Sequence, residues 1–109
     1  MSQRLELLQS MLEESPNDSF LLFALAKEYE KIKQPDDAMN AYMKLKETNP
    51  DYVGLYYHLG KLLEQKERIE EAFFTYKEGM LVAKKEGDQH SFNELAGAKL
   101  GLGDDEDFE

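Results

Sequence analysis

The side chains that most often perform catalysis are scarce in this sequence. Its 109 residues include no cysteine and only two histidines, His58 and His90. A cysteine nucleophile, a thiolate metal site and a disulfide framework are therefore excluded. No serine lies in the glycine-flanked turn that exposes a hydrolase nucleophile. The many carboxylates are typical of a solvated helix surface, because Asp and Glu are mostly exposed in folded proteins. We expect no catalytic residue and no enzyme activity.

Metal and cofactor sites have equally little support. Asp88 and His90 are close in sequence, but no second cluster of ligands would complete a zinc site. The acidic C-terminal residues lack the spacing and the glycine of a calcium-binding loop. A glycine-rich loop that could hold phosphate is also missing. We expect neither a metal nor a cofactor.

Two pairs of side chains could instead bind another molecule. Phe23 and Lys27 are four residues apart, as are Tyr57 and Lys61, so each pair would share one face of a helix. Aromatic rings give contact area at low entropy cost, and lysines attract acidic partners. With His58 beside them, these residues are the candidate partner-binding site. The alternative is that the rings simply pack against neighbouring helices.

The composition is that of a small globular domain whose partners are proteins or peptides. Hydrophobic residues make up 41% and charged residues 33% of the chain, a balance typical of folded chains. The net charge of −10 disfavours nucleic acid and anionic membranes as partners. No apolar stretch approaches the length of a membrane span, and the N-terminus lacks the pattern of a signal peptide. We expect a cytoplasmic protein.

The chain contains an internal repeat of 34 residues. Pro16 and Pro50 are separated by this distance, and further residues of matching size or character share the offset. Coincidences of this number at a single offset indicate two copies of one structural unit. The further pairs are Leu22 with Tyr56, Leu25 with Leu59, Ala26 with Gly60, Tyr29 with Leu63, Ala38 with Ala72, Tyr42 with Tyr76 and Leu45 with Gly79.

Each copy is predicted to contain two helices. The apolar residues of the first half recur at i, i+3, i+4 and i+7, which is one stripe of a helix, and the second half has a stripe of its own. Small residues on these stripes, such as Ala26 and Gly60, would let two helices approach closely. Asp18, Asp36 and Asp51 are expected to be helix N-caps. We predict no strand, and helices at about residues 2–14, 18–33, 36–48, 52–66, 69–85 and 89–100.

This pattern resembles that of the tetratricopeptide repeat family, whose unit is a pair of antiparallel helices in 34 residues. The resemblance implies an all-α fold, an α-solenoid of antiparallel helix pairs with about six helices. Leu45, Leu63 and Lys84 depart from the family pattern. The matching residues are Leu22, Leu25, Ala26, Tyr29, Ala38, Tyr42 and Pro50 in the first copy, and Tyr56, Leu59, Gly60, Ala72, Tyr76 and Gly79 in the second.

The repeat also suggests how the chain is organised. We expect a leading half-repeat helix at 1–15, a first repeat at 16–50, a second at 51–86, a capping helix at 87–102 and a disordered acidic tail at 103–109. The capping helix could start at Ser91, which fits a capping box, or at Asp88. The tail has too little apolar surface to offset its ordering entropy. Its alternative fate is to dock across Lys27 and Lys61 as an internal ligand.

The resemblance implies a non-catalytic scaffold for protein–protein interaction. In the family, the places held here by Phe23, Lys27, Tyr57 and Lys61 face the inner, concave surface, where peptides commonly bind. We therefore expect a peptide or a helix of another protein to bind in that groove. The alternative is a structural module that self-associates through the helix at 2–14 or through the capping helix. The protein would then be a weak homodimer instead of a monomer.

Overall fold

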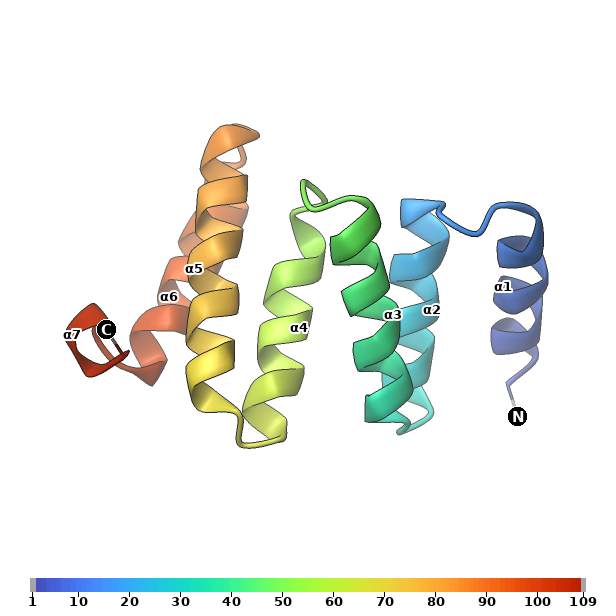
Figure 1. Ribbon diagram of the computed structural model, residues 1–109, viewed down its shortest axis with the longest axis horizontal. Coiled ribbons are helices and arrows are strands. Elements are labelled where there is room, and N and C mark those ends of the chain that lie inside the picture. The colour runs from blue at the N-terminus through green and yellow to red at the C-terminus, as the bar shows by residue number, and fades with distance from the viewer. Residues whose placement is uncertain (1, 109) are drawn as a thin grey trace. The chain divides into compact units, whose positions relative to one another are not determined.

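A computed structural model describes residues 2–108 of the chain. Within that range the protein folds into helices without any strand, which confirms the predicted all-α class (Figure 1). The six predicted helices correspond to α1–α6, and each of their ends lies within two residues of its expected place. A seventh, short helix follows. The helices are α1 (Gln3–Glu14), α2 (Ser19–Lys31), α3 (Pro35–Thr48), α4 (Gly54–Gln65), α5 (Ile69–Lys85), α6 (Gln89–Leu102) and α7 (Asp105–Phe108).

The chain divides into two compact units, Met1–Tyr52 and Val53–Glu109. In the first unit, α2 packs against α3, and α1 packs against α2. Most residues of the apolar stripes that were predicted for α2 and α3 are buried, but Leu25 and Tyr29 are only partly buried. Leu25 packs against a buried cluster that includes Leu8 of α1. The side chains of the first unit that are at most 2% exposed are those of Leu5, Leu22, Ala26, Ala38, Tyr42 and Leu45.

In the second unit, α5 packs against both α4 and α6. Two of the three glycines of the second repeat, Gly60 and Gly79, lie where α4 and α5 are in close contact. A Cβ atom on Gly60 would collide with the ring of Tyr76, and one on Gly79 would lie 2.5 Å from Cβ of Tyr56. Tight helix packing therefore explains both glycines, and the small-residue prediction is confirmed for this helix pair.

The predicted N-cap residues are only partly confirmed by the observed starts of the helices. Asp18 caps α2 as predicted, because its carboxylate accepts the N–H of Leu21 at 3.0 Å. Asp36 does not cap α3, which begins one residue earlier at Pro35 and leaves Asp36 in the first turn. Proline suits the first helical position, so the helix starts there, and a carboxylate in the first turn still favours the helix dipole.

Two further helix starts were uncertain or wrong in the prediction. Asp51 does not cap α4, because the N–H of Tyr52 bonds to the carbonyl of Asn49 in a turn and the helix begins only at Gly54. For α6, the cap is Asp88, the second of the two alternatives. Its carboxylate accepts the backbone N–H of Ser91 at 3.0 Å and the Ser91 hydroxyl at 2.7 Å.

The acidic tail differs from its expectation. In place of a disordered segment, residues 105–108 form helix α7. The ring of Phe108 stacks on that of Phe73, with centroids 4.2 Å apart. The carboxylate of Asp105, the first residue of α7, forms ion pairs with Lys77 and Lys99. The predicted alternative, docking across Lys27 and Lys61, therefore named the wrong lysines. The low apolar content of this segment led us to underestimate its order. One stacked ring and one paired carboxylate are enough to hold a single helical turn.

Candidate functional site

Helix α4 brings the predicted residues of the second unit together. The ring of Tyr57 is half-buried and lies 6.4 Å from the ring of Tyr76 on α5. The ammonium group of Lys61 lies 5.4 Å from the centre of the Tyr57 ring and 6.0 Å from that of Tyr76. His58 meets the Tyr57 ring edge to face at 5.7 Å. The i, i+4 spacing places Lys61 over the ring of Tyr57, and the packing of α5 on α4 adds the ring of Tyr76, the geometry of a cation–π contact.

A glutamate completes this group of side chains. The ammonium group of Lys61 lies 3.6 Å from the carboxylate of Glu64, and the same carboxylate accepts the hydroxyl proton of Tyr76. Burial, and then the hydrogen bond to Glu64, raise the pKa of Tyr76. The side chain of Lys61 is still 41% exposed. Its cation is thus held in place by neighbours and yet remains accessible to a ligand.

In the first unit, Phe23 and Lys27 have different surroundings. The ring of Phe23 is half-buried between Tyr42, 6.1 Å away, and Tyr52, 5.3 Å away. Lys27 is exposed one turn later on α2. It lines an open surface pocket of about 620 Å³, whose other lining residues are Arg4, Ala24, Glu28, Glu30 and Lys31.

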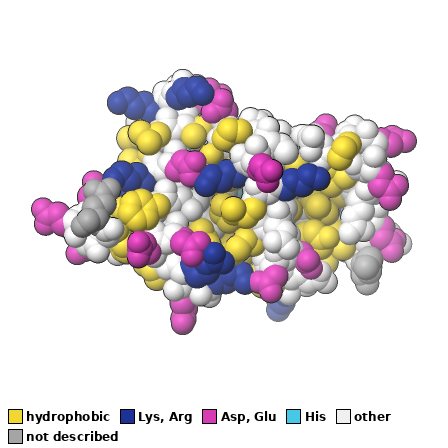
Figure 2. All heavy atoms as spheres, viewed as in Figure 1, with side chains coloured by type: hydrophobic (Ala, Val, Ile, Leu, Met, Phe, Trp, Pro, Cys, Tyr) yellow, Lys and Arg dark blue, Asp and Glu magenta, His cyan; other side chains and the backbone are white. Residues whose placement is uncertain are grey.

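Part of each aromatic ring of the candidate site, Phe23 and Tyr57, is covered by packing within its own unit. Phe23 and Tyr57 were predicted to lie outside the apolar stripes, and both contact a buried tyrosine of the second helix of their repeat. Neither ring is fully buried, so each keeps an accessible portion. Basic and acidic side chains lie among exposed hydrophobic ones on the surface of each unit (Figure 2). A surface of this kind can meet a partner with both apolar and charged groups.

Sequence reasoning missed a hydrogen bond that recurs in both repeats. The hydroxyl of Tyr42 donates to Glu30, and that of Tyr76 donates to Glu64. The signal was present in the sequence, because Glu30 and Glu64 share the 34-residue offset of the tyrosines. Each bond joins the second helix of a repeat to the first, and so fixes the helix that carries the candidate lysine.

Glu28 is a further residue that the sequence did not single out. It is only 5% exposed. Its carboxylate accepts the hydroxyl proton of Ser2 at 2.6 Å and lies 3.5 Å from the guanidinium of Arg4. Since Ser2 also caps α1, the buried carboxylate ties the start of α1 to α2. We regard Glu28 as a structural residue of the first unit.

The described residues contain neither a metal site nor a membrane-spanning helix. Over residues 2–108, no group of three metal-binding side chains could hold an ion. None of the helices in the same range is long and apolar enough to cross a membrane.

Comparison with known proteins identifies the repeat. The family model for the tetratricopeptide repeat matches residues 21–52 and 53–86, which together make up more than half of the chain. The chain belongs to the tetratricopeptide repeat family. Proteins built from this repeat bind other proteins, so a role in protein interaction follows at this general level. No curated protein sequence matches the chain at a significant level.

Solved structures that resemble this chain agree with this assignment. The solution structure of a tetratricopeptide repeat domain protein from Salinibacter ruber is 46% identical, covers 80% of this chain and 88% of its own, and has a TM-score of 0.77. A protein from Bordetella parapertussis is 27% identical over 94% of this chain and 89% of its own, with a TM-score of 0.79. The type III secretion translocator chaperone SycD of Yersinia enterocolitica shares the fold, with a TM-score of 0.82, 15% identity and coverage of 90% and 68%.

Proposed function

We propose that this tetratricopeptide repeat protein is a non-catalytic scaffold that binds a peptide or a helix of another protein through the first helices of its repeats. The observation that carries the proposal is the position of Lys61 over the rings of Tyr57 and Tyr76. Phe23 and Lys27 occupy the same two places in the first repeat. The residues that we assign to the partner site are Phe23, Lys27, Tyr57, His58 and Lys61.

The chemistry of these side chains defines the partner that would fit them. The half-exposed rings suit apolar side chains, and the two lysines suit carboxylates. Lys61 is already held by Tyr57 and Glu64, so little side-chain entropy is lost when a ligand binds there. The net charge of −10 opposes an acidic partner at long range. At physiological salt this repulsion is screened beyond about 8 Å, while direct contacts persist.

The test is to remove the two lysine charges without disturbing the core. Partners captured by the wild-type chain are measured by calorimetry against Lys27→Gln with Lys61→Gln. We expect the affinity to fall by about tenfold, the loss of two charge-assisted contacts. Lysine variants are preferable to Phe23→Ala with Tyr57→Ala, because both rings also pack within their own units.

A matched control distinguishes the loss of the binding site from the change in overall charge. Lys44→Gln with Lys85→Gln removes the same charge from exposed positions on α3 and α5, the second helices of the repeats. The control should bind like the wild type. If both double variants weaken binding equally, only overall charge matters, and the assignment to the first helices is wrong.

Self-association is the second candidate function, and one observation favours it. Leu7 and Met11 on α1 are 61% and 44% exposed and are four residues apart, so they share one face of the helix. Sedimentation at several concentrations distinguishes the candidates. A scaffold for other proteins should remain monomeric, whereas a homodimer would gain mass with concentration and lose it on Leu7→Glu.

A further inference from the structure

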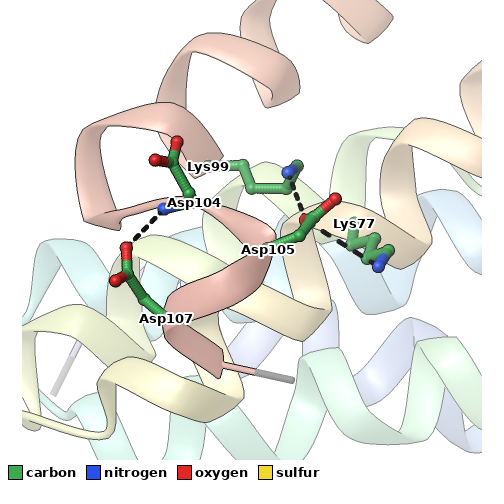
Figure 3. Close-up of polar contacts among 5 residues, drawn as sticks. All are labelled: Lys77, Lys99, Asp104, Asp105 and Asp107. Atoms are coloured by element: carbon green, nitrogen blue, oxygen red, sulfur yellow. Dashed lines mark hydrogen bonds and ion pairs between the residues drawn. The ribbon is translucent and has the colours of Figure 1, made fainter.

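Helix α7 is bound to the body of the second unit by one aromatic and one ionic contact. The ring of Phe108 stacks on that of Phe73, with centroids 4.2 Å apart and planes 23° apart. The carboxylate of Asp105 lies 3.0 Å from the ammonium group of Lys99 and 3.8 Å from that of Lys77 (Figure 3). These two anchors of α7 are three residues apart, so they lie on the same side of one helical turn.

The lysine that receives the carboxylate of α7 is itself largely buried. Lys99 is only 16% exposed, and its ammonium group also lies 4.7 Å from the centre of the Phe73 ring. The hydrogen bond from Lys99 lowers the pKa of Asp105. Phe73 on α5 is fully buried while α7 is in place. Beneath α7, its ring and Lys99 on α6 form one aromatic and cationic surface, to which Lys77 also contributes. Because Lys99 is held over a ring, the surface is preorganised for a carboxylate.

The tail is also shaped to fit this surface. Gly103 has φ +146°, a conformation that side chains other than glycine rarely adopt. It turns the chain back after α6. The carboxylate of Asp107 accepts the N–H of Asp104 at 2.7 Å (Figure 3), as in a capping box. Both anchors are therefore presented by a defined helical turn.

The tail leaves part of the neighbouring surface unfilled. A pocket of about 480 Å³ lies beside it, and Asp105 is the one residue of the tail among its lining residues. Its lining combines apolar side chains, among them Met80, Leu81 and Phe92, with three lysines and two aspartates. The pocket could therefore take the apolar side chains of an acidic segment longer than α7.

We propose that Phe73, Lys77 and Lys99 form a second binding surface, which recognises a segment of another protein with a carboxylate followed three residues later by an aromatic ring. Asp105 and Phe108 make α7 the tethered occupant of that surface. A partner segment must displace α7 before it binds. A short tether gives its occupant an effective concentration in the millimolar range, so only a segment that also fills the adjoining pocket competes well.

The experiment measures binding of the tail sequence in trans. The probe is a fluorescein-labelled peptide with the sequence of residues 103–108, Gly-Asp-Asp-Glu-Asp-Phe. Its anisotropy is titrated with the full chain and with a full-length variant, Asp105→Asn with Phe108→Ala, whose tail no longer occupies the surface. We expect the released variant to bind the peptide at least about tenfold more tightly than the wild type does, because its surface is vacant.

Two controls test the recognition itself. Adding Lys99→Gln to the released variant should remove most of the binding. A peptide with alanine in place of its phenylalanine should also bind poorly, and this control leaves the protein unchanged. The proposal is overturned if the released variant binds no peptide up to about 1 mM, the tethered range. Equal binding by wild type and released variant, or full binding of the alanine peptide, also overturns it.

Discussion

At the scale of single residues, two phenol hydroxyls join the paired helices of the repeats. Tyr42 donates to Glu30 and Tyr76 donates to Glu64, and both tyrosine rings are fully buried. A buried phenol that lost its proton would place a second negative charge beside each carboxylate. Burial first, and the neighbouring glutamate second, therefore raise the pKa of both tyrosines.

This arrangement predicts a loss of stability at alkaline pH. Folding raises the pKa of Tyr42 and Tyr76, so the folded chain holds these protons more tightly than the unfolded chain does. Their contribution is complete below about pH 10, the ordinary tyrosine pKa, and is lost as the pH rises toward the folded values. Urea denaturation from pH 8 to pH 11 should show a fall that Tyr42→Phe with Tyr76→Phe reduces. An equally steep fall in the double variant would contradict the assignment.

The glycines give a second prediction at this scale. Gly60→Ala should destabilise the protein by about 1–3 kcal/mol, because the added methyl group would overlap the ring of Tyr76. Gly97→Ala is the matched control, since a Cβ there meets no atom within 4 Å. That change should stabilise α6 by about 0.5–1 kcal/mol through helix propensity. Thermal denaturation of both variants is the measurement, and a stabilised Gly60→Ala variant would refute the close packing.

At the scale of elements, the sequence predicted what depends on periodicity. Helices α1–α6 could be predicted from apolar residues at helical spacing and from the 34-residue offset. Their ends could be placed because residues close in the sequence determine where a helix begins and ends. The cap at Asp36 was wrong because Pro35 is an equally local signal that starts the helix one residue earlier. Helix α7 was missed because its stability comes from Phe73, Lys77 and Lys99, which are remote in sequence.

The candidate site shows the same division. The pairing of Tyr57 with Lys61 could be predicted, because it depends only on i, i+4 spacing within one helix. The contribution of Tyr76 could not, because that ring belongs to α5 and meets Lys61 only after the helices pack. Glu64 was overlooked as a partner, although its i, i+3 spacing from Lys61 and its 34-residue offset from Glu30 were usable signals.

The docking of α7 should be sensitive to acid. Lys99 first, and Lys77 to a smaller extent, lower the pKa of Asp105. The interaction is therefore fully present above about pH 4, the ordinary aspartate pKa, and is lost as the pH falls through the lower folded value. NMR spectra recorded from pH 6 to pH 2 should show the Phe108 ring signals moving toward those of an unstructured peptide. Asp105→Asn should produce that shift already at pH 6, and unchanged ring signals in the variant would refute the role of the ion pair.

At the scale of the whole molecule, the excess of acidic residues is the main electrostatic influence on stability. The chain has 23 acidic and 13 basic residues, so repulsion among like charges opposes the compact state. Individual pairs on the surface, such as Arg68 with Glu71 at 2.6 Å, contribute little because both side chains are exposed. Screening should therefore remove more repulsion than attraction.

Added salt should accordingly stabilise the protein. We expect the melting temperature at neutral pH to rise when sodium chloride is increased from about 10 mM to about 150 mM, because the Debye length falls from about 30 Å to about 8 Å. Differential scanning calorimetry is the measurement, with sucrose of equal osmolarity as the uncharged control. A melting temperature that falls with salt would mean that ion pairs outweigh repulsion.

The central claim is that partners bind to the first helices of the repeats, and photo-crosslinking tests it most directly. A photoreactive phenylalanine is placed at Tyr57 on α4 or, as a control, at Met43 on α3, which is 49% exposed. Each variant is irradiated with a partner whose binding has been measured. The account predicts a crosslinked product from position 57 and little or none from position 43. A product from position 43 alone would place the partner on the second helix and contradict the account.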